Sequence, residues 1–146
     1  MKSKTILVQI MLISMLGGTA LATEVSYING RAVGDEGTPF SGAVMVDDTL
    51  YVSGDIGLVD GEVPDDPAQE ARAVLDSIKD TLAAAGMTWD DVVVVQVFCS
   101  DVSHYGAFNE VYRTYFTKEF PARAFIGSGA LLFDARFEVM VTAVKR

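Results

Sequence analysis

The sequence has only one cysteine and one histidine, Cys99 and His104, so it offers little from which a metal site or a nucleophilic site could be built. A zinc site needs three or four clustered Cys, His or carboxylate ligands, and no such cluster has the required spacing. A Ser-His-Asp triad would have one possible base and no nucleophile motif of the strand–turn–helix type. Cys99 cannot form an internal disulfide, and because it follows an apolar run we expect a buried, unreactive thiol. We expect His104 at a helix start, in contact with solvent.

Positive charge is also scarce. Eleven Lys and Arg residues face twenty Asp and Glu residues, which gives a formal net charge of -9. Nucleic acids and anionic membranes bind proteins through clustered Lys and Arg, and no basic cluster follows the N-terminal segment. The composition therefore disfavours both as partners. The length of 146 residues fits one domain, which can bury a core without disulfides.

The N-terminal residues have the order of a secretory signal peptide. Lys2 and Lys4 precede an apolar stretch at residues 6–16, and the small-residue pattern Ala-Leu-Ala follows at residues 20–22. A membrane helix needs roughly 20 apolar residues, so this stretch is too short to span a bilayer comfortably. The pattern predicts a signal peptide at residues 1–22 and cleavage after Ala22. The mature protein would be periplasmic or secreted, with a single domain at residues 23–146.

Hydrophobic periodicity predicts the element order β-β-β-α-β-α-β-β. Runs with a two-residue alternation, or unbroken β-branched runs, indicate strands at residues 25–27, 41–46, 50–53, 92–98 and 137–144, with a further strand around Arg123. The β-branched run at residues 92–98 is typical of a central strand that is buried on both faces. Two helices would pack on one face of this mixed sheet, which gives an α+β fold.

Two stretches have the signals of helices. In the first, Asp66 is the expected N-cap, Pro67 the first helical residue, Gln69 the capping-box residue and Gly86 the terminating residue. Glu70 is expected on its solvent face. The apolar stripe of this helix is formed by Ala71, Val74, Leu75, Ile78, Leu82 and Ala85. In the second helix, Ser103 is the expected cap, Lys118 ends the helix, and the stripe is formed by Phe108, Val111, Tyr112, Tyr115 and Phe116.

Arg123 and Glu138 are the candidate functional residues. They belong to two strands that are neighbours in sequence, and therefore plausible neighbours in space. One interpretation is an ion pair between the strands. The other is a site in which Arg123 binds a substrate carboxylate bidentately while Glu138 orients or activates a water molecule. The residues alone leave both interpretations open.

The order and spacing of several short motifs from residue 40 to residue 146 resemble those of the RidA (YjgF) family of enamine/imine deaminases. The motifs are Ser53-Gly54, Ala84-Ala85-Gly86, Phe98 with Asp101, Asn109, Pro121-Ala122-Arg123, Phe137-Glu138-Val139 and Ala143-Val144. The resemblance implies a chorismate-mutase-like fold, in which a mixed β-sheet is backed by two helices. It also implies a homotrimer with a central barrel and active sites in clefts between subunits.

The resemblance implies hydrolysis of 2-imino acids, derived from 2-enamino acids, to 2-keto acids and ammonia, with no metal or organic cofactor. Arg123 matches the arginine that holds the substrate carboxylate, and Glu138 matches the glutamate that positions the water. Gly54 matches a glycine that lines the pocket, with Ser53 and Asn109 as its neighbours. On this basis Arg123 and Glu138 should flank a cleft and not neutralise each other.

Three positions depart from the family pattern. Phe40 stands where a tyrosine is common, Phe125 where a small residue or cysteine is common, and Met140 where a second carboxylate is common. Phe40 and Phe125 are therefore counted among the expected substrate-binding residues. An alternative is a non-catalytic protein that binds small carboxylate metabolites in the same cleft between subunits.

Overall fold

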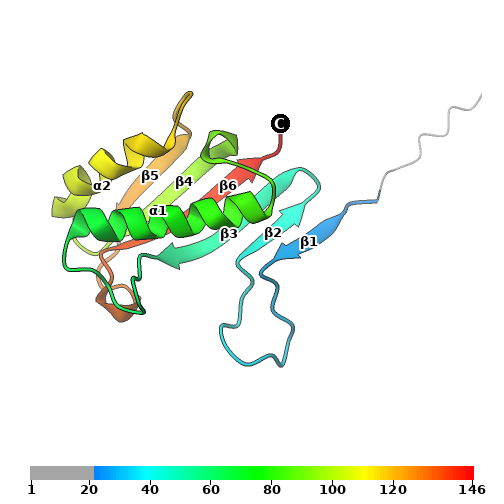
Figure 1. The fold of residues 1–146 in the computed structure, drawn as a ribbon, viewed down its shortest axis with the longest axis horizontal. Helices are drawn as coiled ribbons and strands as arrows, with labels where there is room; N and C mark the ends of the chain where they lie inside the picture. The colour runs from blue at the N-terminus through cyan, green and yellow to red at the C-terminus, as the bar shows by residue number, and fades with distance from the viewer. Residues whose placement is uncertain (1–21) are drawn as a thin grey trace, which may run out of the picture.

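The computed structural model describes residues 22–146, which form a six-stranded sheet and two α-helices (Figure 1). The strands are β1 (Val25–Ile28), β2 (Ala43–Val46), β3 (Thr49–Ile56), β4 (Val92–Cys99), β5 (Ala122–Gly127) and β6 (Phe137–Val144), and the helices are α1 (Pro67–Ala84) and α2 (Tyr105–Tyr112). The predicted order of strands and helices is confirmed. Residues 1–21 of the predicted signal peptide lie outside the described residues. Within the described range, no helix combines the length and apolar character needed to cross a membrane.

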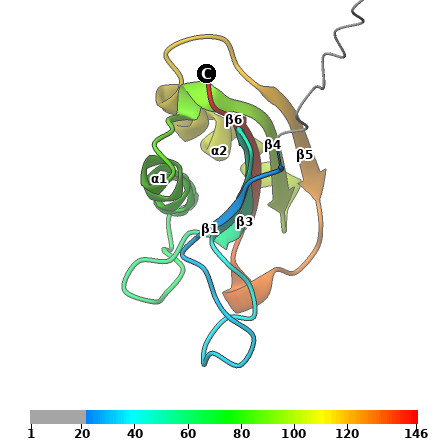
Figure 2. The same cartoon turned by 90° about the vertical axis from the view of Figure 1, so that its right-hand side faces the viewer.

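The strand order in the sheet is β1-β2-β3-β6-β4-β5. All neighbouring strands are antiparallel except β4 and β5, which are parallel, so the sheet is mixed as expected. Both helices lie against the same face of the sheet (Figure 2). The alternating residues of β6 that face these helices are buried, and these are Phe137, Val139, Val141 and Ala143. The core is therefore the layer between the sheet and the two helices.

The N-terminus of α1 begins as the sequence predicts. The Asp66 carboxylate accepts a hydrogen bond from the backbone N–H of Ala68, and Pro67 occupies the first turn. In a capping box the Asp66 carboxylate would accept from the N–H of Gln69 instead, so the predicted capping box is not the arrangement seen here. At the other end Gly86 has φ of +72°, a left-handed conformation that glycine adopts without steric cost.

The prediction that Glu70 faces solvent is wrong. Glu70 is fully buried and forms an ion pair with Arg136, at 2.8 Å between Oε2 and Nη1. The spacing of four residues from Glu70 through Val74 and Ile78 to Leu82 gives the physical reason, because residues four apart share one face of a helix. Glu70 thus lies on the apolar stripe, and Arg136 is the cation that pairs with it there.

The second helix begins and ends differently from the prediction. The cap is Asp101, not Ser103, because the Asp101 carboxylate accepts a hydrogen bond from the Ser103 N–H and starts a short 3₁₀ turn. Helix α2 follows and gives way to a second 3₁₀ turn at Arg113–Tyr115, so it stops well before Lys118. His104, predicted to contact solvent, is half-buried with its ring 6.2 Å from that of Phe137.

Strand β4 is buried on one face only, in contrast to the prediction. Val95 and Val97 pack under the helices, whereas Val94 is 41% exposed and Gln96 is exposed. The reason is the placement of both helices on one side, which leaves the other side without a covering layer in a single chain (Figure 2). We call this side the uncovered face. Its members include Tyr51, Val94, Gln96, Met140 and Thr142.

Candidate functional site

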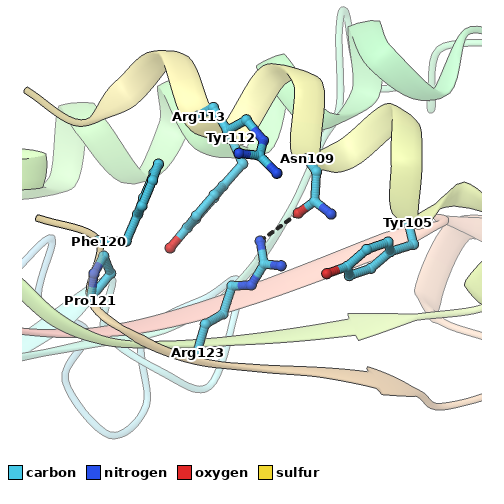
Figure 3. A pocket seen from close by; sticks show the side chains of 7 residues that line it. All are labelled: Tyr105, Asn109, Tyr112, Arg113, Phe120, Pro121 and Arg123. Carbon is cyan, nitrogen blue, oxygen red and sulfur yellow. Dashed lines mark hydrogen bonds between the residues drawn. The ribbon is translucent and has the colours of Figure 1, made fainter.

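Arg123 projects from the edge strand β5 toward helix α2. It pairs in register with Val95, a buried residue under the helices, so both side chains lie on the helix-covered face. Its Nη1 donates a hydrogen bond of 2.7 Å to Oδ1 of Asn109 on α2 (Figure 3). Asn109 therefore fixes one corner of the guanidinium group and leaves its other N–H groups for a different acceptor.

Aromatic rings surround the Arg123 guanidinium. Its central carbon lies 4.7 Å from the ring centroid of Tyr112, 5.7 Å from that of Tyr105 and 5.8 Å from that of Phe125. Such contacts stabilise a cation and remove competing water. A cavity of about 190 Å³ opens here, lined by Tyr105, Asn109, Tyr112, Arg113, Phe120, Pro121 and Arg123 (Figure 3). We call Tyr105, Asn109, Tyr112 and Arg123 together the Arg123 site.

The charge of Arg123 has no carboxylate partner within residues 22–146, where the one ion pair joins Arg136 to Glu70. The Tyr112 hydroxyl is buried and has no hydrogen-bond partner among the residues that the structure describes. Burial raises the pKa of Tyr112 to about 12, so this hydroxyl stays neutral at any physiological pH. The Arg123 site is accordingly a cationic pocket with aromatic walls, a chemistry suited to a small carboxylate.

Glu138 points to the opposite side of the sheet. It pairs in register with Phe98, while its neighbours in β6, Phe137 and Val139, are buried under the helices. Its half-buried carboxylate borders a cavity of about 1050 Å³ that also contains Phe40, Ser53 and Gly54. We call Phe40, Ser53, Gly54 and Glu138 together the Glu138 site. Within residues 22–146, this carboxylate accepts no hydrogen bond.

Gly54 makes a close approach to Glu138. A Cβ atom added at Gly54 would lie 2.2 Å from Oε1 of Glu138, a separation that real atoms do not adopt. The pairing of β3 with β6 shifts register between Val52 and Asp55, so the backbone around Gly54 is displaced from the regular ladder. The glycine and the irregular strand together make room for the carboxylate.

Ser53 has a supporting role within this site. Its hydroxyl donates a hydrogen bond of 2.7 Å to the carbonyl oxygen of Ser41, and its N–H donates to the carbonyl oxygen of Gly42. These bonds tie β3 to the segment that follows Phe40, whose ring is 51% exposed at the cavity. Ser53 thus positions the wall that carries Phe40.

The predicted site residues fall into two groups. Arg123 and Asn109 lie together on the helix-covered face, whereas Phe40, Ser53, Gly54 and Glu138 lie together around the cavity on the other side. Because Arg123 and Glu138 lie on opposite faces of the sheet, the ion pair that the sequence left open is not formed. Phe125 packs its ring edge-on against Tyr105 at 4.9 Å and against Phe108 at 5.6 Å, so it supports the Arg123 site from the core.

The buried Glu70 holds the start of β6 from behind the Glu138 site. Its Oε1 accepts hydrogen bonds from the backbone N–H groups of Arg136 at 2.6 Å and Phe137 at 3.1 Å. The Arg136 guanidinium also donates to the carbonyl oxygens of Pro64 and Asp65. The residue before Glu138 is therefore fixed by a charged network that the sequence interpretation missed.

The aromatic walls of the Arg123 site were also missed as functional residues. Tyr105, Asn109 and Tyr112 are separated by four and three residues, the spacing that places side chains on one face of a helix. The spacing was the available signal. The sequence interpretation places Tyr112 in the apolar stripe of the second helix and gives Tyr105 no role, because ring spacing alone does not distinguish a core from a pocket wall.

Comparisons with known proteins identify related chains. The sequence profile of the family described as endoribonuclease L-PSP matches residues 34–145. The 2-iminobutanoate/2-iminopropanoate deaminases of Mus musculus and Homo sapiens are each 38% identical, over 110 and 114 residues. Both alignments cover 73% of this chain, and they cover 82% of the mouse protein and 80% of the human protein.

Solved structures share the fold. The crystal structure of RidA from the Antarctic bacterium Psychrobacter sp. has a TM-score of 0.70 and 31% identity, covering 78% of this chain and 91% of that one. The YjgF gene product of E. coli has a TM-score of 0.73 and 31% identity, covering 83% of this chain and all of that one. The mixed sheet with two helices on one face is therefore an arrangement that these proteins have in common.

Proposed function

The chain belongs to the endoribonuclease L-PSP family, which includes the RidA and YjgF proteins, and on that basis we propose that it hydrolyses 2-imino acids to 2-keto acids and ammonia. It has the chorismate-mutase-like α+β fold of that family. The curated relatives named as 2-iminobutanoate/2-iminopropanoate deaminases support this reaction. The family description also names an RNA-cleaving activity, but a net charge of -9 gives no electrostatic support for binding RNA.

One observation carries the proposal. A cationic side chain suited to bind a carboxylate, Arg123, and a carboxylate suited to accept a proton, Glu138, each line a cavity. The Arg123 guanidinium is held by Asn109 and lacks a carboxylate partner within residues 22–146. In our proposal it binds the substrate carboxylate through its remaining N–H groups, as a planar guanidinium does well. The Tyr112 and Tyr105 rings exclude water around that contact.

Glu138 would supply the proton transfers. It accepts a proton from a water molecule whose oxygen forms a bond to the imine carbon, while the imine nitrogen takes up a proton. The resulting carbinolamine loses ammonia when a proton passes to its nitrogen and the hydroxyl becomes the carbonyl of the keto acid. One water is consumed and one ammonia is released for each imine. The step needs positioning more than strong activation, because imines react readily with water.

We further propose that the protein is a homotrimer in which Arg123 of one subunit and Glu138 of the next face the same cleft. The two residues lie on opposite faces of the sheet in one chain, so a second copy is needed to bring the two sites together. The uncovered face supports assembly, since Tyr51 is 53% exposed, Val94 41% and Met140 36%. A sheet with apolar residues on both faces needs a layer on each. Light scattering at working concentration should give the mass of three chains.

The test of the reaction compares the native chain with Arg123→Ala and Glu138→Ala. Ammonia release is measured from 2-iminopropanoate and 2-iminobutanoate generated in situ by an amino-acid oxidase. We expect each variant to lose at least about 100-fold in kcat/KM. A native chain that only matches the uncatalysed rate, yet binds keto acids, would instead be a non-catalytic carboxylate-binding protein.

A mixing experiment tests whether the site is shared between subunits. The Arg123→Ala and Glu138→Ala chains are coexpressed, and the mixed trimers are purified by two different tags. About a third of the native activity should return, because every mixed trimer has one cleft among its three that pairs an intact Arg123 with an intact Glu138 from the next subunit. A chain that carries both substitutions is the control. Failure of the two single variants to complement each other would exclude a shared site.

Export is a separate proposal, which rests on the N-terminal sequence pattern alone. The mature protein should begin at Thr23 in the periplasm or the medium. Mass spectrometry of the protein recovered from each cell fraction would measure this directly. Full-length chain recovered only from the cytoplasm would exclude export.

A further inference from the structure

The connection between β5 and β6 presents two large apolar side chains to solvent beside the Glu138 site. Leu132 is 71% exposed and Phe133 is 70% exposed, and both line the cavity of about 1050 Å³ that contains Glu138. We call Leu132 and Phe133 the apolar lip. Exposed apolar side chains that gather at one cavity usually mark a surface that binds something.

The backbone of this connection is strained at the lip. Phe133 has φ of 58° and ψ of 25°, and the next residue, Asp134, has φ of 57°. Left-handed conformations are unfavourable for residues with a bulky side chain, and they persist where the surrounding structure enforces them. Ala135 and Arg136 provide that enforcement, because Ala135 is buried and Arg136 belongs to the Glu70 network. The buried segment that follows thus keeps Leu132 and Phe133 exposed, and the left-handed backbone there lowers the stability of the fold.

The cavity is too large and too apolar for a three-carbon acid alone. Its wall includes Phe40, Ile56, Leu58, Leu132, Phe133 and Met140. The volume of about 1050 Å³ is that of the hollow on a single chain, and it leaves room for a larger side chain even where the proposed neighbouring copy fills part of it. A short imino acid bound by Arg123 and Glu138 would leave this apolar surface in contact with water.

We propose that the apolar lip determines substrate specificity, by covering the side chain of 2-imino acids that carry branched or aromatic apolar groups. This inference rests on the proposed function, and it adds the substrate class. The carboxylate and imine of such a substrate would lie between Arg123 and Glu138, and its side chain would extend over Leu132 and Phe133. Burial of that side chain favours the larger substrates.

The test compares imino acids generated in situ from alanine, leucine and phenylalanine. The native chain should show a higher kcat/KM for the leucine and phenylalanine products than for the alanine product. In Phe133→Asn the ring is removed, while asparagine tolerates the left-handed conformation and preserves the turn. We expect kcat/KM for the phenylalanine product to fall by at least about tenfold, with the alanine product within about twofold of native.

Two matched variants separate the ring from a general effect. Phe133→Tyr keeps the aromatic ring and should keep the preference for large substrates. Val33→Asn makes the same replacement at a fully exposed apolar residue outside the cavity, and it should leave all three rates unchanged. An equal loss for all three substrates in Phe133→Asn would overturn the proposal, as would a native preference for the alanine product.

Binding measurements distinguish failure of this inference from failure of the proposed function. Calorimetry on the native chain should show tighter binding of 4-methyl-2-oxopentanoate than of pyruvate, with the difference lost in Phe133→Asn. If no imine is hydrolysed but this binding difference is present, the proposed reaction fails, while the apolar lip still selects larger ligands. If Phe133→Asn instead changes the mass measured by light scattering, the lip is a subunit contact and the inference is wrong.

Discussion

The Arg123 site and the Glu138 site differ in how completely one chain builds them. Arg123 is held by a hydrogen bond of 2.7 Å from Nη1 to Asn109 and by the ring of Tyr112 at 4.7 Å. Glu138 has no such partner within residues 22–146, and its nearest constraint is the close approach of Gly54. One site is ordered by contacts within the chain, and the other is kept open by the absence of a side chain.

This difference matches the two tasks in the proposed reaction. A carboxylate clamp gains from being fixed before the substrate arrives, because binding then loses less conformational entropy. A group that exchanges protons with water must stay accessible to it. In the proposed trimer, the single chain therefore prepares the binding element, and a neighbouring copy would enclose the proton-transfer element.

The largest expected effect comes from the buried support behind the Glu138 site. Glu70→Ala should lower the free energy of unfolding by about 3–5 kcal/mol, because Arg136 would lose its buried partner. Two backbone N–H groups, those of Arg136 and Phe137, would lose their acceptor as well. Urea denaturation measures the change.

The control for Glu70→Ala lies on the same helix. Asp80→Ala removes an exposed carboxylate and should change the free energy of unfolding by less than about 0.5 kcal/mol. Glu70→Gln keeps an acceptor oxygen and should cost less than Glu70→Ala. Equal stability of Glu70→Ala and Asp80→Ala would show that the buried network contributes nothing.

The next effect separates the two sites through activity. Gly54→Ala places a Cβ atom where the Glu138 carboxylate now lies, and the flexible side chain must move away. A displacement of about 1 Å at a catalytic group can lower the rate by roughly 100-fold, so kcat should fall by about that factor. Gly106→Ala is the matched control, because a Cβ atom there meets nothing within 4 Å. Steady-state kinetics that give the same kcat for both variants would contradict the assignment of Glu138.

A smaller effect is expected on the other site. Asn109→Ala removes the acceptor that orients Arg123, and hydrogen bonds to charged groups are worth about 1.5–3 kcal/mol. We expect KM to rise by about tenfold with a smaller change in kcat, since Asn109 positions the clamp without touching the reacting atoms. Glu110→Ala, an exposed neighbour on α2, serves as the control. A fall in kcat with no change in KM would contradict the positioning role and would show that Asn109 acts in the chemical step.

The strands and the first helix could be predicted because their signals are local. The alternation of Phe137, Val139, Val141 and Ala143 depends only on the two-residue period of a strand. The cap at Asp66 and the turn at Gly86 depend on hydrogen bonds and backbone angles within a few residues. Such features need no knowledge of what packs against them, and the structure has all of them.

The remaining features depend on distant partners. Glu70 is buried because Arg136, 66 positions later, supplies its charge partner. Arg123 and Glu138 could be identified from motifs, but their opposite faces follow from the register across β4. Arg123 pairs with Val95, and Val95 pairs with Val141. Glu138 lies three residues before Val141 on β6, so it points the other way. Adjacent strands in sequence favoured adjacency in space, and β4 lies between them instead. Sequence spacing could not predict that separation.

The smallest expected effect is the dependence of stability on the ionisation of Cys99, which lies on β4 between β5 and β6. Cys99 on β4 pairs with Gly127 of β5 and with Phe137 of β6, and its thiol is fully buried. Burial raises the pKa of this thiol, so the native chain holds less thiolate than the unfolded chain at any given pH. The stability that this shift provides is complete below the unfolded pKa, about 8.5, and declines as pH rises through the higher folded value.

Alkylation measures this directly. Iodoacetamide should leave Cys99 of the native protein unmodified near neutral pH and should react readily in denaturant, as mass spectrometry would detect. Substrate analogues bound at the Arg123 site should not alter that protection, because the thiol donates to the carbonyl oxygen of Asp101 and faces the core. Rapid labelling of the native chain would mean that β4 separates from β5 or β6. In that case the two sites would be joined by a mobile strand, and the rigid preparation of the Arg123 site would no longer distinguish it from the Glu138 site.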